Sequence, residues 1–213
     1  MNQTELIALA GLLHDIGKFW MRTGQERPYT RDEEGEFCPS GRDGRPTRQH
    51  VLWGGHFVER FVGDPQVADS VFCHHKPSTR ENWIVSLADC LASGERVEDE
   101  DVEPGDPWEA PLQSIFTALK GRPSTLPRQY FPLSRHLDWN GFFPADEISV
   151  SQDDYRNLWE KFTQAISAYP GGKIQELATW FYLLRRFASR VPAATPTRVE
   201  RYRPDISLFT TPA

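Results

Sequence analysis

The chain has 213 residues and a mass of 24.4 kDa, with 38% hydrophobic residues and a formal net charge of −6 at pH 7. This apolar content excludes wholesale disorder, and the acidic balance excludes a broadly basic nucleic-acid coat protein. Residues 95–109 hold eight acids and one arginine, a local charge of −7, which leaves about +1 for the rest of the chain. We interpret that run as a solvated loop.

The N-terminal segment and the cysteines indicate the compartment. The first residues lack the basic region of a signal peptide, and no apolar run approaches the length of a membrane span. Cys38, Cys73 and Cys90 show no CxxC spacing, and their odd number is typical of reduced thiols. We therefore predict a cytoplasmic protein with no membrane partner.

Helical spacing of apolar residues begins near the N-terminus. Leu6, Leu9 and Leu13 continue that spacing toward Gly17, so they predict one helix, with Thr4 as its N-cap. Residues 21–49 then break every pattern with glycine, proline and mixed charge, which predicts a long loop. Its six arginines are offset by acids, so we interpret them as solvated.

Further helices are predicted along the rest of the chain. They cover residues 50–62, 67–76, 79–95, 153–169 and 174–191, and a short strand is expected in the tail within 205–213. In the helix at 79–95 one apolar face is expected to carry Trp83, Ile84, Leu87, Ala88 and Leu91. The composition divides the chain into a helical domain at 1–97, an acidic and proline-rich linker at 98–125, and a helical connector at 126–213.

Histidines and aspartates occur together in the first half of the chain. Five of the six histidines lie between positions 14 and 75. Separate predicted helices carry the pair His14-Asp15, His56, the pair His74-His75, and Asp89. A lone histidine on a helix is usually a packing residue, but packed helices can direct such a set toward one point. Imidazole and carboxylate are ligands of transition metals, so we predict a metal site.

The motifs LLHDIGK, CHHKP and ADCLASGER carry a family resemblance. The order HD, H, HH, D resembles the HD superfamily of metal-dependent phosphohydrolases. Within it, the sequence is similar to the N-terminal HD domain of the large signature subunit of type III-A CRISPR-Cas effector complexes, closely over 1–97 and loosely beyond. No GGDD motif occurs, so the resemblance extends only to the N-terminal part of such a subunit.

The resemblance implies a mostly α fold, an HD-superfamily helical domain followed by a smaller helical and linker segment. It implies a cytoplasmic single-stranded DNA endonuclease whose partners, through the full subunit, are other type III effector subunits and guide RNA. It also implies two divalent transition-metal ions, Mn, Ni, Fe or Co in preference to Mg or Zn. The catalytic residues would be His14, Asp15 and Lys18, and the metal ligands His14, Asp15, His56, His74, His75 and Asp89.

The resemblance also assigns individual roles to these residues. Asp15 would bridge the two ions, with His14 and Asp89 completing one site and the other three histidines completing the second. Lys18 would neutralise charge on the phosphate, although a surface lysine is the alternative interpretation. The general HD pattern has a further histidine upstream of HD, and none precedes His14. His136 is a candidate replacement, but an isolated loop histidine is more simply a bystander.

Two other functions stay open at this point. One is a phosphohydrolase acting on a nucleotide or cyclic dinucleotide, and the other is a non-catalytic module that docks CRISPR subunits or RNA. Phe19, Trp20 and Trp53 could stack on bases of a single strand, but core packing is the better interpretation. Cys73, beside the histidine pair, is more simply a small buried residue than a thiolate ligand.

Overall fold

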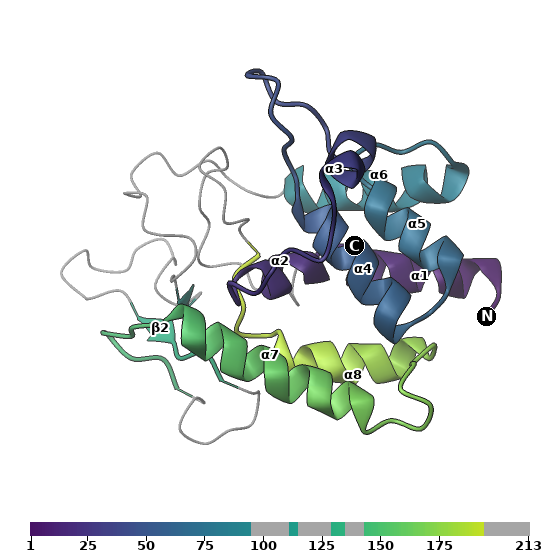
Figure 1. The fold of residues 1–213 in the computed structure, drawn as a ribbon. Helices are drawn as coiled ribbons and strands as arrows, with labels where there is room; N and C mark the ends of the chain where they lie inside the picture. Colours follow the sequence, from purple (N-terminus) through teal and green to yellow (C-terminus); the bar gives the residue numbers. More distant parts are fainter. Residues whose placement is uncertain (95–110, 115–128, 135–142, 194–213) are drawn as a thin grey trace.

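The computed structural model describes residues 1–94, 111–114, 129–134 and 143–193. Within them the order of elements is α1 (Gln3–Leu13), α2 (Ile16–Met21), α3 (Arg31–Phe37), α4 (His50–Phe61), α5 (Pro65–Cys73), α6 (Arg80–Gly94), β1 (Leu112–Gln113), β2 (Tyr130–Phe131), α7 (Gln152–Ser167) and α8 (Leu177–Phe187). The two short strands pair antiparallel, with Leu112 opposite Phe131. The expected mostly α class is confirmed (Figure 1).

The predicted first helix is divided in two. Its N-cap is Asn2 rather than Thr4, because the Asn2 side chain accepts from the backbone N–H of Glu5 and the Glu5 carboxylate accepts from the N–H of Asn2. At the other end α1 stops at Leu13, and Asp15 leaves the regular helical geometry with φ −99° and ψ 2°. The histidine-aspartate pair therefore lies at a helix junction.

The segment at 21–49 is less irregular than predicted. It contains the short helix α3, which Thr30 caps by accepting from the backbone N–H of Glu33. The Lys76 ammonium donates to the carbonyls of Gly35 and Glu36 at the other end of α3, at 3.2 and 2.6 Å. A cation at the C-terminal end complements the helix dipole, so α3 is held against the segment that follows the histidine pair.

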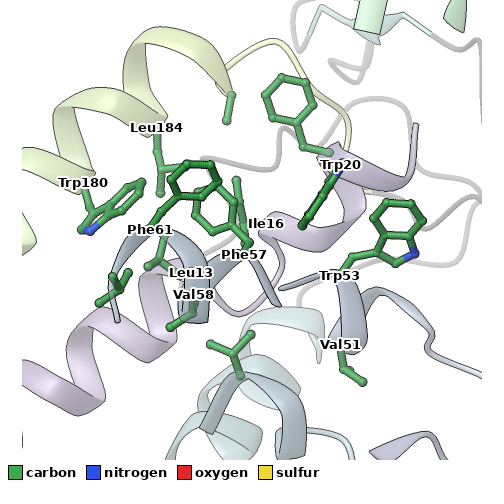
Figure 2. Close-up of a cluster of buried hydrophobic side chains, with 14 of the residues drawn as sticks. Leu13, Ile16, Trp20, Val51, Trp53, Phe57, Val58, Phe61, Trp180 and Leu184 are labelled. Atoms are coloured by element: carbon green, nitrogen blue, oxygen red, sulfur yellow. The ribbon is translucent and has the colours of Figure 1, made fainter. Parts of the chain in front are cut away.

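One hydrophobic core joins the first helices to the last two (Figure 2). Phe57 of α4 is fully buried, and its ring centroid lies 5.5 Å from that of Trp159, 5.8 Å from Phe162 and 5.5 Å from Trp180. Helices α7 and α8 run side by side along one flank of the molecule (Figure 1). The described part of the C-terminal segment thus packs directly on the helices that carry the histidines.

The aromatic residues near the histidine-aspartate pair belong to this core. Phe19 is fully buried, and Trp20 and Trp53 are nearly so. Trp20 stacks on Trp159 with ring centroids 5.4 Å apart, and it meets Trp53 edge to face at 5.1 Å. Core packing, rather than base stacking, is therefore what these three side chains do in the structure.

The apolar face predicted for α6 is largely exposed and does not belong to the core. Trp83, Leu87 and Leu91 are 60%, 59% and 68% exposed, and Ile84 is exposed too. The helix instead buries the side that carries Asn82, Val85 and Asp89 against α1 and α5. Polar contacts explain the choice, because Asn82 accepts a hydrogen bond from the Ser70 hydroxyl and Asp89 faces His14.

Some expectations lie outside the described residues. These are the acidic run at 95–109, the strand expected within 205–213 and His136. In the described part of the chain, no helix combines the length and apolar character needed to cross a membrane.

Candidate metal centre

The first cluster of ligand-type side chains forms where α1 ends. The His14 ring uses Nδ1 to donate to the carbonyl of Gly11 at 2.7 Å, and a carbonyl can only accept, so the lone pair of the neutral ring is at Nε2. That Nε2 atom lies 3.4 Å from Asp15 Oδ2 and 3.4 Å from Asp89 Oδ1. His14, Asp15 and Asp89 are all buried, and we call these three residues the aspartate group of the site.

The second cluster contains three histidines, one at the start of α4 and two directly after the end of α5. His50 is the first residue of α4, and its Nε2 lies 3.2 Å from Nε2 of His75, just beyond the end of α5. His74 donates from Nδ1 to the carbonyl of Val71 at 2.8 Å, which again leaves the lone pair at Nε2. Each of the three offers a ligand atom within 4.8 Å of the other two, and we call them the histidine group.

Asp15 joins the two groups. Its Oδ1 lies 3.4 Å from Nε2 of His50, and its Oδ2 lies 3.4 Å from Nε2 of His14. The Lys18 ammonium donates to Oδ2 at 2.7 Å and is itself buried, so the alternative of a surface lysine is wrong. The Asp15 carboxylate therefore faces the histidine group with Oδ1 and His14 of the aspartate group with Oδ2.

A glycine allows this meeting of α2 and α4. A Cβ atom on Gly17 would lie 2.0 Å from the carbonyl oxygen of His50 and 2.7 Å from the backbone nitrogen of Gly54. Real Cβ atoms do not approach backbone atoms so closely, so only glycine fits with the helices at this separation. The first turn of α4, with His50, can thus lie beside Asp15.

The two negative charges in the aspartate group favour a cation. Burial alone would lower the pKa of His14, but the Asp15 and Asp89 carboxylates outweigh it and raise the pKa to about 10. Burial opposes ionisation of Asp15 as well, yet the charges of Lys18 and His14 hold its pKa well below the usual range. Asp89 shows the same balance, and its interaction with His14 lowers its pKa to about 2.

The histidine group has the opposite character. Burial lowers the pKa values of His50 and His74 well below the usual range. Burial, followed by the positive charge of Arg48, lowers the pKa of His75 to about 4. The three rings are therefore neutral at pH 7, which is the state in which an imidazole nitrogen binds a metal ion.

The donors present fit a transition-metal centre. The Nε2 atom of His74 is buried and has no hydrogen-bond partner among the described residues. A buried nitrogen lone pair without a partner is costly, and a bound cation would satisfy it. At His14, whose pKa is raised, a bound cation would replace the proton that Nε2 holds between the two carboxylates. Four imidazoles and two carboxylates are ligand types suited to Mn, Fe, Co, Ni or Zn, and Asp15 could contact an ion in either group.

The structure places five of the six predicted ligands together, and His56 is the exception. Its Nε2 lies 2.8 Å from Glu33 and its Nδ1 3.0 Å from Glu59, so both ring nitrogens are used away from the two groups. The histidine of α4 that lies beside His74 and His75 is His50 instead. Cys73 is also outside both groups, and its thiol lies 3.7 Å from Asp69.

A signal for His50 was present in the sequence. Residues four, seven and eleven positions after His50 are Gly54, Phe57 and Phe61, which form the inward stripe of α4. His56 is six positions after His50 and therefore points to another side of the helix. Helical register, rather than the mere presence of a histidine on the helix, distinguishes the two.

Known proteins match the chain in sequence and in fold. The HD domain family profile matches residues 2–94. The chain is 26% identical to the type III-A CRISPR system single-strand-specific deoxyribonuclease Cas10/Csm1 of Methanocaldococcus jannaschii, with 98% of this chain and 26% of that protein aligned. It is 28% identical to the protein of the same name from Thermococcus onnurineus, over 78% of this chain and 22% of that protein.

Solved structures show the same fold. The crystal structure of T. onnurineus Csm1 is similar with a TM-score of 0.60 at 23% identity, covering 98% of this chain and 27% of that one. The Csm1-Csm4 subcomplex of a type III-A interference complex gives 0.60 at 21% identity, covering 98% and 26%. The chain spans about a quarter of the length of the curated relatives it matches. Residues 2–94 therefore form an HD domain, and the chain is homologous to the Cas10/Csm1 proteins of type III-A CRISPR systems.

Proposed function

We propose that this chain is a metal-dependent phosphodiesterase that cuts single-stranded DNA. The observation that carries the proposal is the position of Asp15, with one oxygen toward His50 and the other toward His14. A carboxylate that faces two ligand groups at once is the arrangement expected for a pair of metal ions. Each group supplies at least two further donors, which supports one ion in each.

Each residue has a part in this proposal. His50, His74 and His75 would hold one ion, and His14 and Asp89 would hold the other, with Asp15 shared. Such ions, when bound, supply an activated water and neutralise charge on the phosphodiester. Lys18 fixes the orientation of the Asp15 carboxylate through its 2.7 Å contact. Its ammonium also adds positive charge beside the position where charge develops on the phosphate.

Substrate and partners are proposed from the relatives. Both curated relatives are named single-strand-specific deoxyribonucleases, which supports single-stranded DNA as the substrate. Csm1 appears with Csm4 in a solved structure of that family, which supports assembly of this chain with other type III-A subunits. We propose guide RNA as a partner only through the full subunit and that assembly. We propose Mn, Ni, Fe or Co as the metal, because a mixed set of imidazole and carboxylate donors suits first-row transition metals better than Mg.

The test compares two histidines of the same helix. His50→Ala and His56→Ala each remove one imidazole from α4, but only His50 lies in the histidine group. Purified variants are assayed with Mn²⁺ on single-stranded DNA, double-stranded DNA, RNA and a cyclic dinucleotide, and Mn²⁺ binding is measured by calorimetry. We expect His50→Ala to lower cleavage of single-stranded DNA at least a hundredfold and His56→Ala to stay within about threefold of the parent.

Other results would reject parts of the proposal. Faster turnover of the cyclic dinucleotide than of DNA would identify a small-molecule phosphohydrolase. Absence of cleavage with any divalent metal, in a folded protein that binds other type III-A subunits, would identify a docking module. Equal loss in both variants would show that the two groups are not the centre.

A further inference from the structure

Two ligands of the histidine group lie at the ends of their helices. His50 is the first residue of α4, and the N-cap residue Gln49 makes no side-chain capping hydrogen bond. His75 follows His74, which is the C-cap of α5. Terminal turns lack part of the hydrogen bonding within the helix, and they fray. Helix formation by itself therefore does not hold the two rings at the 3.2 Å that separates their Nε2 atoms.

The short helix α3 contacts the residue that precedes His50. The Glu34 carboxylate accepts a hydrogen bond from the side-chain amide of Gln49 at 3.0 Å. One residue earlier on α3, the Glu33 carboxylate lies 2.8 Å from Nε2 of His56, which is further along α4. Helix α3 is thus attached to α4 at two points, and one of them is directly beside a ligand.

Helix α3 also contacts the residue that follows His75. The Lys76 ammonium donates to the carbonyls of Gly35 and Glu36, at 3.2 and 2.6 Å. Carbonyls in the last turn of a helix lack a helical N–H partner, and a hydrogen bond from a charged donor to them is strong. The two accepting residues follow Glu34 directly, so three consecutive residues of α3 link the positions next to the two ligands.

Helix α3 lies on the surface of the domain and is not packed into its core. None of its seven residues is buried, and the Phe37 ring stacks on Phe72 with the centroids 4.7 Å apart. An element with few buried apolar contacts opens locally at a low cost in free energy. The position of α3 can therefore change while the rest of the domain stays folded.

We propose that α3 is a brace for the metal centre, and that Gln49 and Lys76 are positioning residues for the two ligands beside them. This inference rests on the proposed function, because it needs an ion in the histidine group. Metal ligands must be held within a fraction of an ångström, and groups that orient them from outside the coordination sphere change metal affinity by about 10–100-fold. Docking of α3 and binding of the ion then favour each other, because coupling between two sites is reciprocal.

The first experiment measures the Mn²⁺ affinity of the whole chain by calorimetry, and His50→Ala identifies the binding step that belongs to the histidine group. We expect the double variant Gln49→Ala/Lys76→Ala to bind Mn²⁺ about tenfold more weakly in that step, with each single variant in between. Lys76→Arg should restore most of the affinity, because a guanidinium can also donate to the two carbonyls. Lys161→Ala, which removes an exposed lysine from α7, is the control and should match the parent.

Hydrogen exchange tests the reciprocal effect without any cleavage assay. Mass spectrometry follows the backbone amides of residues 31–38 with and without saturating Mn²⁺. Binding should slow their exchange in the parent by up to about tenfold, the same factor by which docking of α3 raises the affinity. The double variant should show no such slowing. Residues needed only for folding would instead lower the melting temperature of the metal-free chain and speed exchange equally with and without Mn²⁺.

The outcomes separate the brace from the proposed function. If the parent binds Mn²⁺ and cleaves DNA while the double variant keeps the parent affinity, the brace is rejected and the function stands. If the double variant loses both the affinity and the exchange response but the parent cleaves no DNA, the brace stands and the nuclease is rejected. If the parent binds no Mn²⁺, both are rejected.

Discussion

Gly17 offers the sharpest test of how the fold builds the centre. In Gly17→Ala the new Cβ would lie 2.0 Å from the His50 carbonyl oxygen, and both nearest neighbours are backbone atoms that cannot rotate away. Ordinary contacts between such atoms are about 3.5 Å, so α2 and α4 must separate by more than about 1 Å. Overpacking of this kind costs about 1–3 kcal/mol, which lowers the melting temperature by roughly 2–10 °C in a chain of this size.

The separation also reaches the ligands. His50 Nε2 and Asp15 Oδ1 are 3.4 Å apart and lie on the two elements that Gly17 brings together. Because metal sites require ligand positions within a fraction of an ångström, we expect Mn²⁺ affinity to fall about 10–100-fold. Thermal unfolding by circular dichroism and Mn²⁺ titration by calorimetry measure the two effects separately.

Gly35 provides a matched control, because a Cβ there meets no atom within 4 Å and the residue lies in helix α3. Gly35→Ala should keep the Mn²⁺ affinity and should not lower the melting temperature, since alanine favours the helical state. The argument would be refuted if Gly17→Ala had the parent melting temperature and the parent Mn²⁺ affinity.

Three further predictions concern packing, thiol reactivity and pH. Phe162→Ala should lower the free energy of unfolding by about 3–5 kcal/mol, because Phe162 is fully buried against Phe57. Urea denaturation measures this loss, and a loss below about 1 kcal/mol would mean that α7 is not part of the core. Burial raises the pKa of the Cys38 thiol to about 12, so iodoacetamide at pH 8 should label exposed Cys90 and spare Cys38 in the folded chain, as read by mass spectrometry. Desolvation raises the pKa of Glu33, but hydrogen bonds from Thr30 and the charge of His56 outweigh it and lower this pKa. The ionised Glu33 side chain therefore stabilises the fold above the pKa that Glu33 has in the unfolded chain. This stabilisation is lost as pH falls through the lowered pKa of the folded chain. The stability difference between the parent and Glu33→Gln should therefore shrink on acidification below about pH 4, and a difference that stayed constant with pH would contradict this assignment.

The sequence alone was sufficient for the helical class and for most of the candidate centre. Apolar residues at helical spacing predicted most of the helices, because that periodicity reflects a local property of the chain. The histidine-aspartate pair, the adjacent histidines and Asp89 were recognisable because their order along separate predicted helices resembles the HD pattern. Five of the six predicted ligands lie in the two groups for this reason.

Tertiary packing decided what helical spacing left open. His50 and His56 lie on the same helix. Gly17 allows α2 to approach one side of α4 closely, and His50 lies on that side, so the imidazole of His50 is the one that reaches Asp15. On α6 two faces competed, and contacts of Asn82 and Asp89 with neighbouring helices outweighed the more apolar side that carries Trp83. Both outcomes depend on residues distant in sequence, because burial of a face is a property of the partner that covers it as well as of the helix itself.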